Sequence, residues 1–448
     1  MLVTWVLCLV LLIFQYYISP YKFRDMRVIF DAWWLVVITL FVVSKSQYYP
    51  TTGLVWNHIF VGILAVNMAD FFFRLAGTKI KKVKLRTNYV KPVQIGMDSV
   101  VNSYYKVIIC IQLILLLAMI PLFLRALPTI MIGGLGSMRS LYVGATTETF
   151  MSTFERILYI HFGVFPGVCA CALLAAVLWA NGQMKLRYLS ITALNIACVT
   201  LITGARTYIF YFFIFVVGAF AKDGKKILLV SHKKYNRVKR NVILLVVVIL
   251  VVLIAITSQR SFGGNRSSRE NLFTTVSVYF SGGIKLFDVV LNNPEQFGLN
   301  YPMFGIAIIS GLLSVIQLLL SYVPVIGSFF YGELITNLVQ QNVTSYIMVG
   351  PQLTMNAAPT MFYYFMRDFG VFGLLSGGMV VALLMNMATK QLRYNSFKAS
   401  ILYLEVLLIV ILGVCWWEPY RMEFWVIPVQ VFFWLWLAKK VCVWRKKL

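Results

Sequence analysis

The feature that most constrains this chain is a series of long apolar segments. A helix that crosses the hydrocarbon core of a bilayer needs about 20 mostly apolar residues, because each residue advances it by about 1.5 Å. Only helices and closed barrels satisfy their backbone groups in lipid, and these segments are too long for barrel strands. They therefore predict an all-α polytopic membrane protein with about eleven transmembrane helices. The segments lie at roughly 2–19, 28–46, 54–76, 106–126, 156–180, 187–203, 207–221, 241–258, 359–388, 398–417 and 422–438.

The composition agrees with a membrane protein. Residues of the set AVILMFWYC make up 60% of the 448 residues, and charged residues make up 12%, whereas soluble domains are about 45–50% apolar and about 25% charged. This balance excludes an ordinary soluble enzyme, a disordered chain and a nucleic-acid-binding domain, despite a formal net charge of +25. We expect residues 1–448 to form a single integral membrane domain in contact with the lipid bilayer.

The basic residues are distributed unevenly between the loops. When loops are assigned alternately to the two sides of the membrane, 29 of the 40 Lys and Arg residues fall on one side, and every segment on that side is basic. By the positive-inside rule this side is cytoplasmic, so the C-terminus is expected inside and the N-terminus outside. Segment 1–19 has no basic stretch before it and no small-residue cleavage site, which indicates a retained helix rather than a signal peptide.

Three of the predicted external segments have distinctive sequences. Residues 127–155 are expected to form a loop that contains Gly and Thr, and 416–421 a short interfacial turn with aromatic residues. Residues 259–358 are expected to form a large external loop with short helices. An apolar stretch at 303–322 lies within that loop. A single membrane crossing there would put the basic C-terminal tail outside, which argues against it. The Ser and Gln residues of the stretch favour a surface-lying or re-entrant helix instead. A two-helix hairpin through 302–330 would leave the tail on the cytoplasmic side and stays open.

Familiar cofactor and catalytic motifs are missing from the sequence. The seven cysteines lie in the apolar segments or at their ends, and we find no metal-ligand spacing, paired-carboxylate motif, Walker loop or Gly-x-Ser-x-Gly sequence. We therefore expect no metal and no cofactor. His58 and His161 lie near the outer ends of their segments, where a hydrogen-bonded interfacial residue is the favoured interpretation and a general base the alternative.

The external side is rich in arginine. Nine of its 11 basic residues are Arg, whereas Lys predominates on the cytoplasmic side. The orientation of a membrane protein depends only on positive charge, which Lys supplies as well as Arg. Binding two phosphate oxygens at once requires the planar guanidinium group of Arg. Arg125, Arg139 and Arg156 are expected to snorkel, cap helices or pair with acids.

The other external arginines fall mainly in three clusters. Arg206 lies in Thr-Gly-Ala-Arg-Thr (203–207), a predicted tight turn where a new helix starts and its free N–H groups favour an anion. Arg260 and Arg266 lie in the Gly- and Ser-containing segment 258–269, which could clamp a phosphate or serve as a flexible loop entry. Tyr363 and Arg367 share a helix face within 356–373, and an Arg367–Asp368 pair inside a membrane is a candidate functional site.

The order of four motifs resembles bacterial oligosaccharide repeat-unit polymerases, the Wzy-type O-antigen and capsular polysaccharide polymerases. The motifs are Thr-Gly-Ala-Arg-Thr (203–207), Gln-Arg-Ser (259–261), Tyr-Phe-Ser-Gly-Gly (279–283) and Pro-Thr…Tyr…Asp-Phe-Gly-Val-Phe-Gly (359–373). They cover roughly 190–380, and the topology covers the whole chain. An Arg-x10-Gly motif of some members is not matched, because Gly218 lies twelve residues after Arg206.

The resemblance implies a metal-independent inverting membrane glycosyltransferase with a GT-C-like fold in the bacterial cytoplasmic membrane. Such an enzyme transfers a growing glycan from undecaprenyl pyrophosphate to the non-reducing end of a second lipid-linked oligosaccharide repeat unit, so its partners are that donor and acceptor. A chain-length regulator protein is a further candidate partner. We predict that the pyrophosphate is bound by Arg206 and Arg260 and then by Arg266 and Arg367.

The remaining roles are open between several residues. The general base is predicted among Asp368, Glu333 and His161, in no fixed order, and sugar contacts among Tyr279, Tyr363 and Arg421. Two alternative functions share these features: an O-antigen-ligase-like glycan transferase and a flippase or transporter for lipid-linked oligosaccharide. A flippase usually has internal repeats and short loops, neither of which is found here.

Overall fold

The computed structural model describes residues 1–79, 97–143, 150–181, 184–230, 272–323, 333–340, 347–351, 353–355, 359–394 and 396–444, with single residues in between. Arg260 and Arg266 lie outside the described residues, and so does almost all of the predicted segment 241–258. The helices are α1 (Leu2–Ile18), α2 (Met26–Val43), α3 (Gly53–Lys79), α4 (Met97–Val143), α6 (Thr153–Arg156), α7 (Val164–Ala180), α8 (Leu186–Thr203), α9 (Thr207–Val230), α11 (Leu272–Asn292), α12 (Ser310–Ser321), α14 (Ile335–Val339), α15 (Met361–Phe369), α16 (Phe372–Gln391), α17 (Phe397–Leu412) and α18 (Met422–Trp444).

The described part of the chain is an all-α, multi-pass membrane protein. Six helical stretches are long and apolar enough to cross a membrane, and α1, most of α8 and α12 are shorter apolar helices. Two short strands, β1 (Ile347–Gly350) and β2 (Leu353–Met355), pair antiparallel. The six stretches are Met26–Val43, Gly53–Leu75, Tyr105–Tyr142, Thr153–Ala180, Phe372–Gln391 and Met422–Val441.

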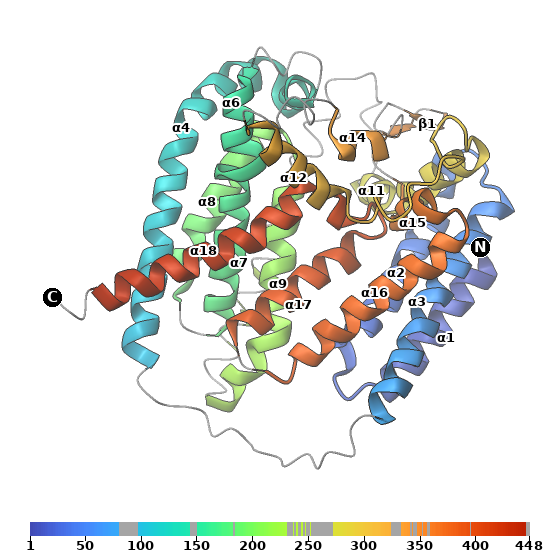
Figure 1. Cartoon of the computed structure of the whole chain (residues 1–448), viewed down its shortest axis with the longest axis horizontal. Coiled ribbons are helices and arrows are strands. Elements are labelled where there is room, and N and C mark those ends of the chain that lie inside the picture. Colours follow the sequence, from blue (N-terminus) through green and yellow to red (C-terminus); the bar gives the residue numbers. More distant parts are fainter. Residues whose placement is uncertain are drawn as a thin grey trace. The chain divides into compact units, whose positions relative to one another are not determined.

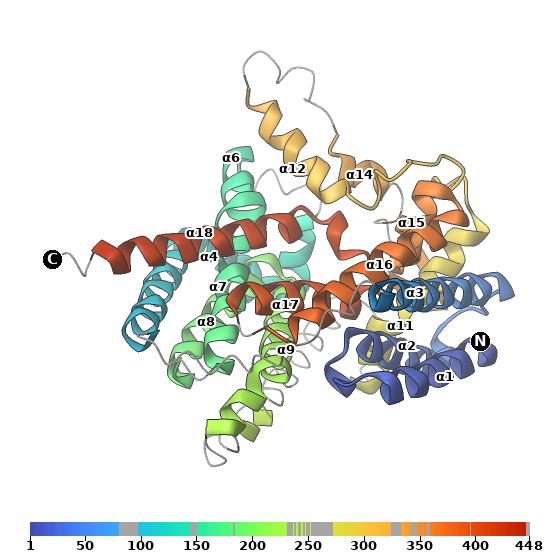
Figure 2. The same ribbon diagram turned by 60° about the horizontal axis from the view of Figure 1, so that its bottom comes forward.

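The chain divides into two compact units, and α17 and α18 each contribute to both. Unit 1 contains 1–86, 269–395 and 405–425, and unit 2 contains 87–268, 396–404 and 426–448. In unit 1, α1, α2, α3 and α16 lie side by side (Figures 1 and 2). Hydrogen bonds join Thr4 to Trp56 and Gln15 to Asn67, so α1 runs parallel to α3. Arg27 at the start of α2 reaches Asp70 late in α3, so α2 runs in the opposite direction.

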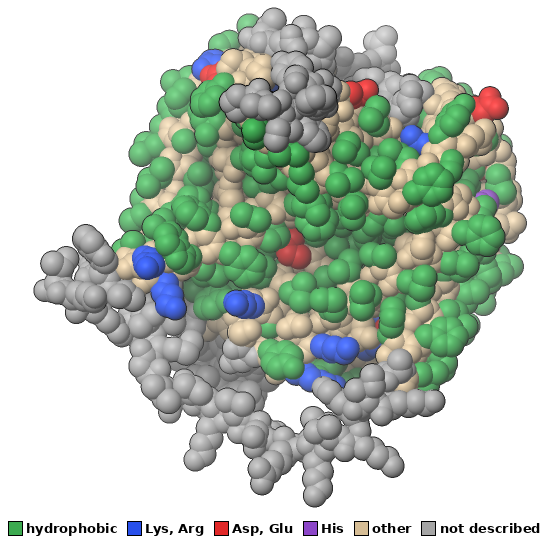
Figure 3. Space-filling model, in the orientation of Figure 1, with side chains coloured by type: hydrophobic (Ala, Val, Ile, Leu, Met, Phe, Trp, Pro, Cys, Tyr) green, Lys and Arg blue, Asp and Glu red, His purple; other side chains and the backbone are tan. Residues whose placement is uncertain are grey.

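Charge divides the two ends of this helix group. The end where α1, α3 and α16 finish and α2 begins carries a set of basic side chains, whereas hydrophobic side chains follow the length of α16 (Figure 3). The other end, where α2 finishes and α16 begins, carries Lys45. Such a division is typical of helices that cross a bilayer. The basic set contains Lys22, Arg24, Arg27, Arg74, Lys390 and Arg393.

The large predicted loop contains more helix than expected. Besides the short α12 and α14 it includes α11, a helix of 21 residues that packs on α2 and α3. Ser281 in α11 contacts the hydroxyls of Ser44 and Tyr48 at 3.2 and 3.0 Å, and burial raises the pKa of Tyr48 to about 12. The loop was expected to contain short helices, and α11 is longer than these because residues 281–288 are buried where the helix packs on α2.

The predicted single segment 359–388 is two helices. Gly370 has φ of 57° and ψ of −141°, a conformation open essentially to glycine alone, so it ends α15 and lets α16 start at Phe372. A Cβ on Gly373 would lie 1.8 Å from the carbonyl oxygen of Phe365, so the two helices meet at backbone contact. Trp417, predicted as an interfacial aromatic, is buried, and its indole donates to the Ile308 carbonyl at 2.8 Å.

Unit 2 is built around α7. All residues of α7 are buried, and the helix packs against α4, α8 and α9 (Figure 1). The segment Ile157–Phe162 before it is a π-helix, whose last carbonyl, together with that of Gly163, accepts hydrogen bonds from the Gln430 amide of α18.

The predicted loop 127–155 is largely helical. α4 continues to Val143, although it contains Pro121 and Pro128 and has a non-helical residue at Gly134. The apolar sequence Thr-Ile-Met-Ile that follows Pro128 prolongs the helix up to this kink.

Candidate functional site

The turn that joins α8 to α9 has the predicted form. Gly204 takes a left-handed conformation with φ of 58°, the Thr203 hydroxyl accepts the N–H of Ala205 at 3.1 Å, and α9 begins at Thr207. A Cβ on Gly204 would lie 2.8 Å from the Leu135 carbonyl oxygen, so the turn packs directly on the backbone of α4. Only glycine suits both the conformation and the contact.

This turn positions Arg206 directly before the first turn of α9. Arg206 is partly exposed, and its carbonyl accepts the N–H groups of Ile209 and Phe210 at 3.1 and 3.2 Å. Arg139 of α4 also lies at the turn, with its backbone nitrogen 2.9 Å from the Cβ position of Gly204. The N-terminus of a helix favours negative charge, and guanidinium groups bind phosphate oxygens in pairs. This group of residues therefore has the chemistry of an anion site.

His161 lies in the π-helix of unit 2. π-Helical turns within α-helices are often found at functional sites, and the Gln430 amide holds the end of this one. The described structure thus gives His161 an unusual backbone, while its role as a base stays a prediction.

Arg367 and Asp368 bind the backbone of the chain between Gly298 and Ile308 in unit 1. The guanidinium of Arg367 donates to the carbonyls of Gly298, of Tyr301 at 2.9 Å and of Leu338 at 3.3 Å. Both residues are buried, with exposed fractions of 5% and 0%. In this arrangement both Nη groups of Arg367 donate to carbonyls. Pyrophosphate binding by these groups, which stays a prediction, would require the bonds to open.

The carboxylate of Asp368 is held by backbone donors. Ala307 and Ile308 donate their N–H groups to its two oxygens at 2.7 and 2.9 Å. Burial raises the pKa of Asp368, and these hydrogen bonds act in the opposite direction. A carboxyl whose two oxygens are occupied in this way positions a backbone segment; its role as a base also stays a prediction.

Tyr363 belongs to the same group. Its hydroxyl donates to the Val339 carbonyl at 2.8 Å, and the side chain is fully buried, which raises its pKa to about 12. The buried ring presents no face to a sugar in this structure. Tyr279 is partly exposed and has an edge contact with Phe280, so its geometry leaves a sugar contact open.

Glu333 and Arg421 occupy separate positions in unit 1. Glu333 is exposed, and its carbonyl accepts the Gln317 amide at 3.1 Å. Arg421 pairs with Glu423 at 3.5 Å. In unit 2, Arg125 pairs with Glu155 at 2.5 Å, as predicted for an external arginine that neutralises an acid. The structure therefore gathers Tyr363, Arg367 and Asp368 in unit 1, whereas Arg206 and His161 belong to unit 2.

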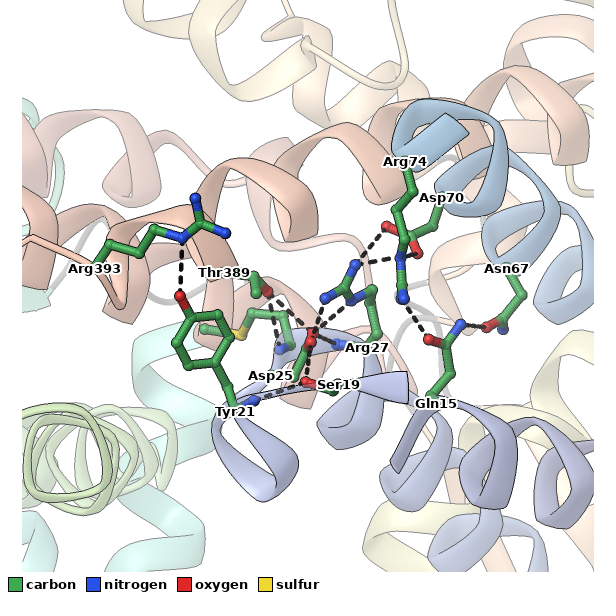
Figure 4. Close-up of polar contacts among 11 residues, drawn as sticks. Gln15, Ser19, Tyr21, Asp25, Arg27, Asn67, Asp70, Arg74, Thr389 and Arg393 are labelled. Carbon is green, nitrogen blue, oxygen red and sulfur yellow. Dashed lines mark hydrogen bonds and ion pairs between the residues drawn. The ribbon is translucent and has the colours of Figure 1, made fainter. Parts of the chain in front are cut away.

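A buried ionic network, which the sequence analysis missed, lies at the basic end of unit 1 (Figure 4). Asp25 caps α2, and its carboxylate accepts Ser19 Oγ at 2.6 Å, Thr389 Oγ1 at 3.1 Å and the guanidinium of Arg27. Burial acts to raise the pKa of Asp25, but the hydrogen bond and the charge of Arg27 outweigh it, and the pKa lies below its ordinary value. Asp25 thus ties α2 to the end of α16.

The network continues to α3 and α1. Arg27 reaches Asp70 at 3.5 Å, Asp70 pairs with Arg74 at 2.8 Å, and Arg74 donates to the side chain of Gln15. Gln15 in turn donates to Asn67 at 3.1 Å. Acidic residues at or inside apolar segments are rare, and they are the sequence signal that could have indicated this network. The arginines alone are explained by the positive-inside rule.

Among the described residues, no group of three or more His, Cys, Asp and Glu side chains is arranged to hold a metal ion. Comparison with known proteins gives no match to a protein-family model, to a curated protein or to a solved structure.

Proposed function

We propose that the protein is a polysaccharide polymerase of the bacterial cytoplasmic membrane. It transfers a growing glycan from undecaprenyl pyrophosphate to the non-reducing end of a second lipid-linked repeat unit, on the outer face of the membrane. The proposal rests on the motif resemblance and on the multi-pass membrane architecture. The observation that carries it is the α8–α9 turn, because the turn combines Arg206, the start of a helix and close contact with α4.

The chemistry of the reaction requires such a site. The donor leaves as a pyrophosphate, whose developing charge is stabilised by donors already in place. Hydrogen bonds to charged groups contribute roughly 1.5–3 kcal/mol each, so two or three arginines suffice for a substantial effect. In the proposal Arg206 and Arg260 carry most of it, and residues of unit 1 such as Arg367 and Asp368 position the external segment.

The finer architecture belongs to the same proposal. We propose about eleven transmembrane helices in a GT-C-like arrangement, with the N-terminus outside and the C-terminus in the cytoplasm. The basic end of unit 1 supports this sidedness, since Lys390 and Arg393 at the end of α16 are exposed beside Lys22 and Arg24.

Reconstitution of the purified chain with a lipid-linked repeat unit tests the function, with glycan length as the readout. Long glycans are expected without nucleotide sugar or divalent metal. Arg206→Ala and Arg260→Ala are expected to abolish the polymer at normal expression, and the Lys variants to restore it only in part, because Lys lacks the paired donors.

Arg125→Ala is the matched control. Arg125 is an arginine of the same unit that is half exposed and already paired with Glu155, so its loss is expected to leave glycan length near normal. Near-normal polymer from both Arg206→Ala and Arg260→Ala contradicts the pyrophosphate site. Translocation without new glycosidic bonds favours a flippase, and transfer to a different acceptor favours a ligase.

A further inference from the structure

The segment Tyr301–Ile309, named here the 301–309 segment, is held firmly by its backbone. Met303 donates its N–H to the Arg367 carbonyl at 2.9 Å, and Phe304 donates to the Asp368 carbonyl at 3.1 Å. The Asp368 carboxylate accepts two more N–H groups of the segment. The end of α15 therefore fixes the conformation of this segment.

Four large apolar side chains of the fixed segment point away from the protein. Tyr301 and Phe304 are 70% and 73% exposed, and Ile306 and Ile309 are also exposed. Phe304 has a φ of 51°, a conformation that non-glycine residues rarely adopt. A conformation of this kind persists where surrounding contacts over-determine it, and it often marks a functional position. Here it keeps an aromatic ring on the surface.

The exposed surface continues into a membrane-spanning helix. The Phe304 ring contacts that of Phe369, with centroids 6.3 Å apart. Phe372 at the start of α16 is 79% exposed. Beyond it the exposed apolar side chains Leu375, Met379, Leu383 and Met387 recur every three or four residues, which makes one stripe along a candidate membrane span.

The sequence around the segment carries no charge. No Asp, Glu, Lys or Arg occurs between Glu295 and Glu333. A large apolar surface without charges is unfavourable in water and typical of a membrane contact, and aromatic residues favour the level of the lipid head groups.

We infer that the 301–309 segment is a lipid anchor, inserted into the bilayer interface beside the start of α16. Its partner is the boundary between lipid head groups and acyl chains, into which Tyr301 and Phe304 project. The contact would fix the depth of the external segment relative to the membrane, and it does not depend on the proposed polymerase activity.

Nitroxide labels on the full-length chain in lipid vesicles test this anchor. Phe304→Cys and Tyr301→Cys carry the label, and its collisions with oxygen, which concentrates in lipid, and with a water-soluble nickel chelate are measured. Leu383→Cys is the lipid-facing control and Glu295→Cys, an exposed residue, is the water-facing control. The wild-type chain labelled in parallel gives the background of the native cysteines.

We expect the ratio of oxygen to nickel collisions at both positions to be several-fold above that at Glu295→Cys and below that at Leu383→Cys, because Leu383 lies near the middle of α16 and the ratio rises with depth in the bilayer. Ratios equal to the water-facing control overturn the inference, since the segment would then lie in solvent. Protection from both reagents also overturns it, because it would show that protein covers the surface.

Discussion

At the scale of single residues, the surroundings of an arginine decide what it can do. Arg206 lies at a helix start on the surface of a turn, Arg367 is buried against three backbone carbonyls, and Arg27 is buried between two carboxylates. The guanidinium group suits all three because it stays charged and offers several donors in a plane. Residue type alone therefore identifies candidate anion sites, and burial with its partners separates ligand binding from structural roles.

The ionised form of Asp25 is expected to stabilise the fold. Its pKa lies below the ordinary value of 3.8, so its contribution to the free energy of unfolding is complete above that pH and is lost as the pH falls through the lower pKa of the folded state. Thermal unfolding in detergent from about pH 6 to about pH 2 measures this loss. Asp25→Asn is expected to unfold about 3–5 kcal/mol more easily at neutral pH, because it leaves Arg27 without its closest partner.

The same variant provides the test of cause. Asp25→Asn cannot titrate at this position, so its melting temperature is expected to fall less steeply with acid than that of the wild type. Equal acid sensitivity of the two chains would show that Asp25 is not the group responsible.

At the scale of elements, helix positions were predictable where an apolar segment has polar flanks. α1, α2, α3 and α8 begin and end within a few residues of the predicted bounds, and α9 starts at Thr207 as expected. The tight turn before α9 was also predictable, because its contacts are local. Helix breaks were harder: Gly370 interrupts the predicted segment 359–388, whose apolar sequence resumes directly after it, and the proline residues of α4 do not end that helix.

Features that depend on contacts between residues far apart in the chain could not be predicted from the sequence. α11 is a helix with a buried face toward α2, which hydropathy alone does not distinguish from a loop helix. The ionic network joins Asp25 to Thr389 across 364 positions. Arg367 and Asp368 were recognised as a notable pair, but their backbone partners in 298–308 could only be seen in three dimensions.

The turn between α8 and α9 offers a prediction at this scale. Gly204→Ala introduces a Cβ in a left-handed conformation, at roughly 1–2 kcal/mol, and also 2.8 Å from the Leu135 carbonyl oxygen. Gly53→Ala is the control, since Gly53 has no positive φ and nothing lies within 4 Å of the added Cβ. Thermal unfolding is expected to show a clear loss for Gly204→Ala and little change for Gly53→Ala. Equal melting temperatures of the two variants would mean that neither the left-handed conformation nor the contact with α4 restricts position 204.

At the scale of the whole molecule, the meaning of the charge depends on where the basic residues lie relative to the apolar helices. The net charge of +25 does not describe a binding surface, because most basic residues belong to loops on one predicted side. Within unit 1 the basic side chains gather at the end where α1, α3 and α16 finish, and the ionic network is buried at the same end. The end of unit 1 that carries these basic residues is therefore also the place where the ionic network connects four helices.

This division makes the sidedness of unit 1 testable on the intact protein. Ser46→Cys lies at the end of α2 opposite the basic cluster, and Tyr394→Cys lies beside Arg393; both positions are exposed. In intact cells a membrane-impermeant maleimide is expected to label Ser46→Cys, whereas Tyr394→Cys should react only after permeabilisation, because the positive end stays on the cytoplasmic side. The wild-type chain gives the background of native cysteines. The reverse pattern would invert the topology and move the α16 start, with the 301–309 segment, to the cytoplasmic leaflet. The anchor would then contact the inner leaflet, and the outer face assumed for the proposed transfer would be wrong, so this one measurement constrains the side of the anchor and the side of the reaction.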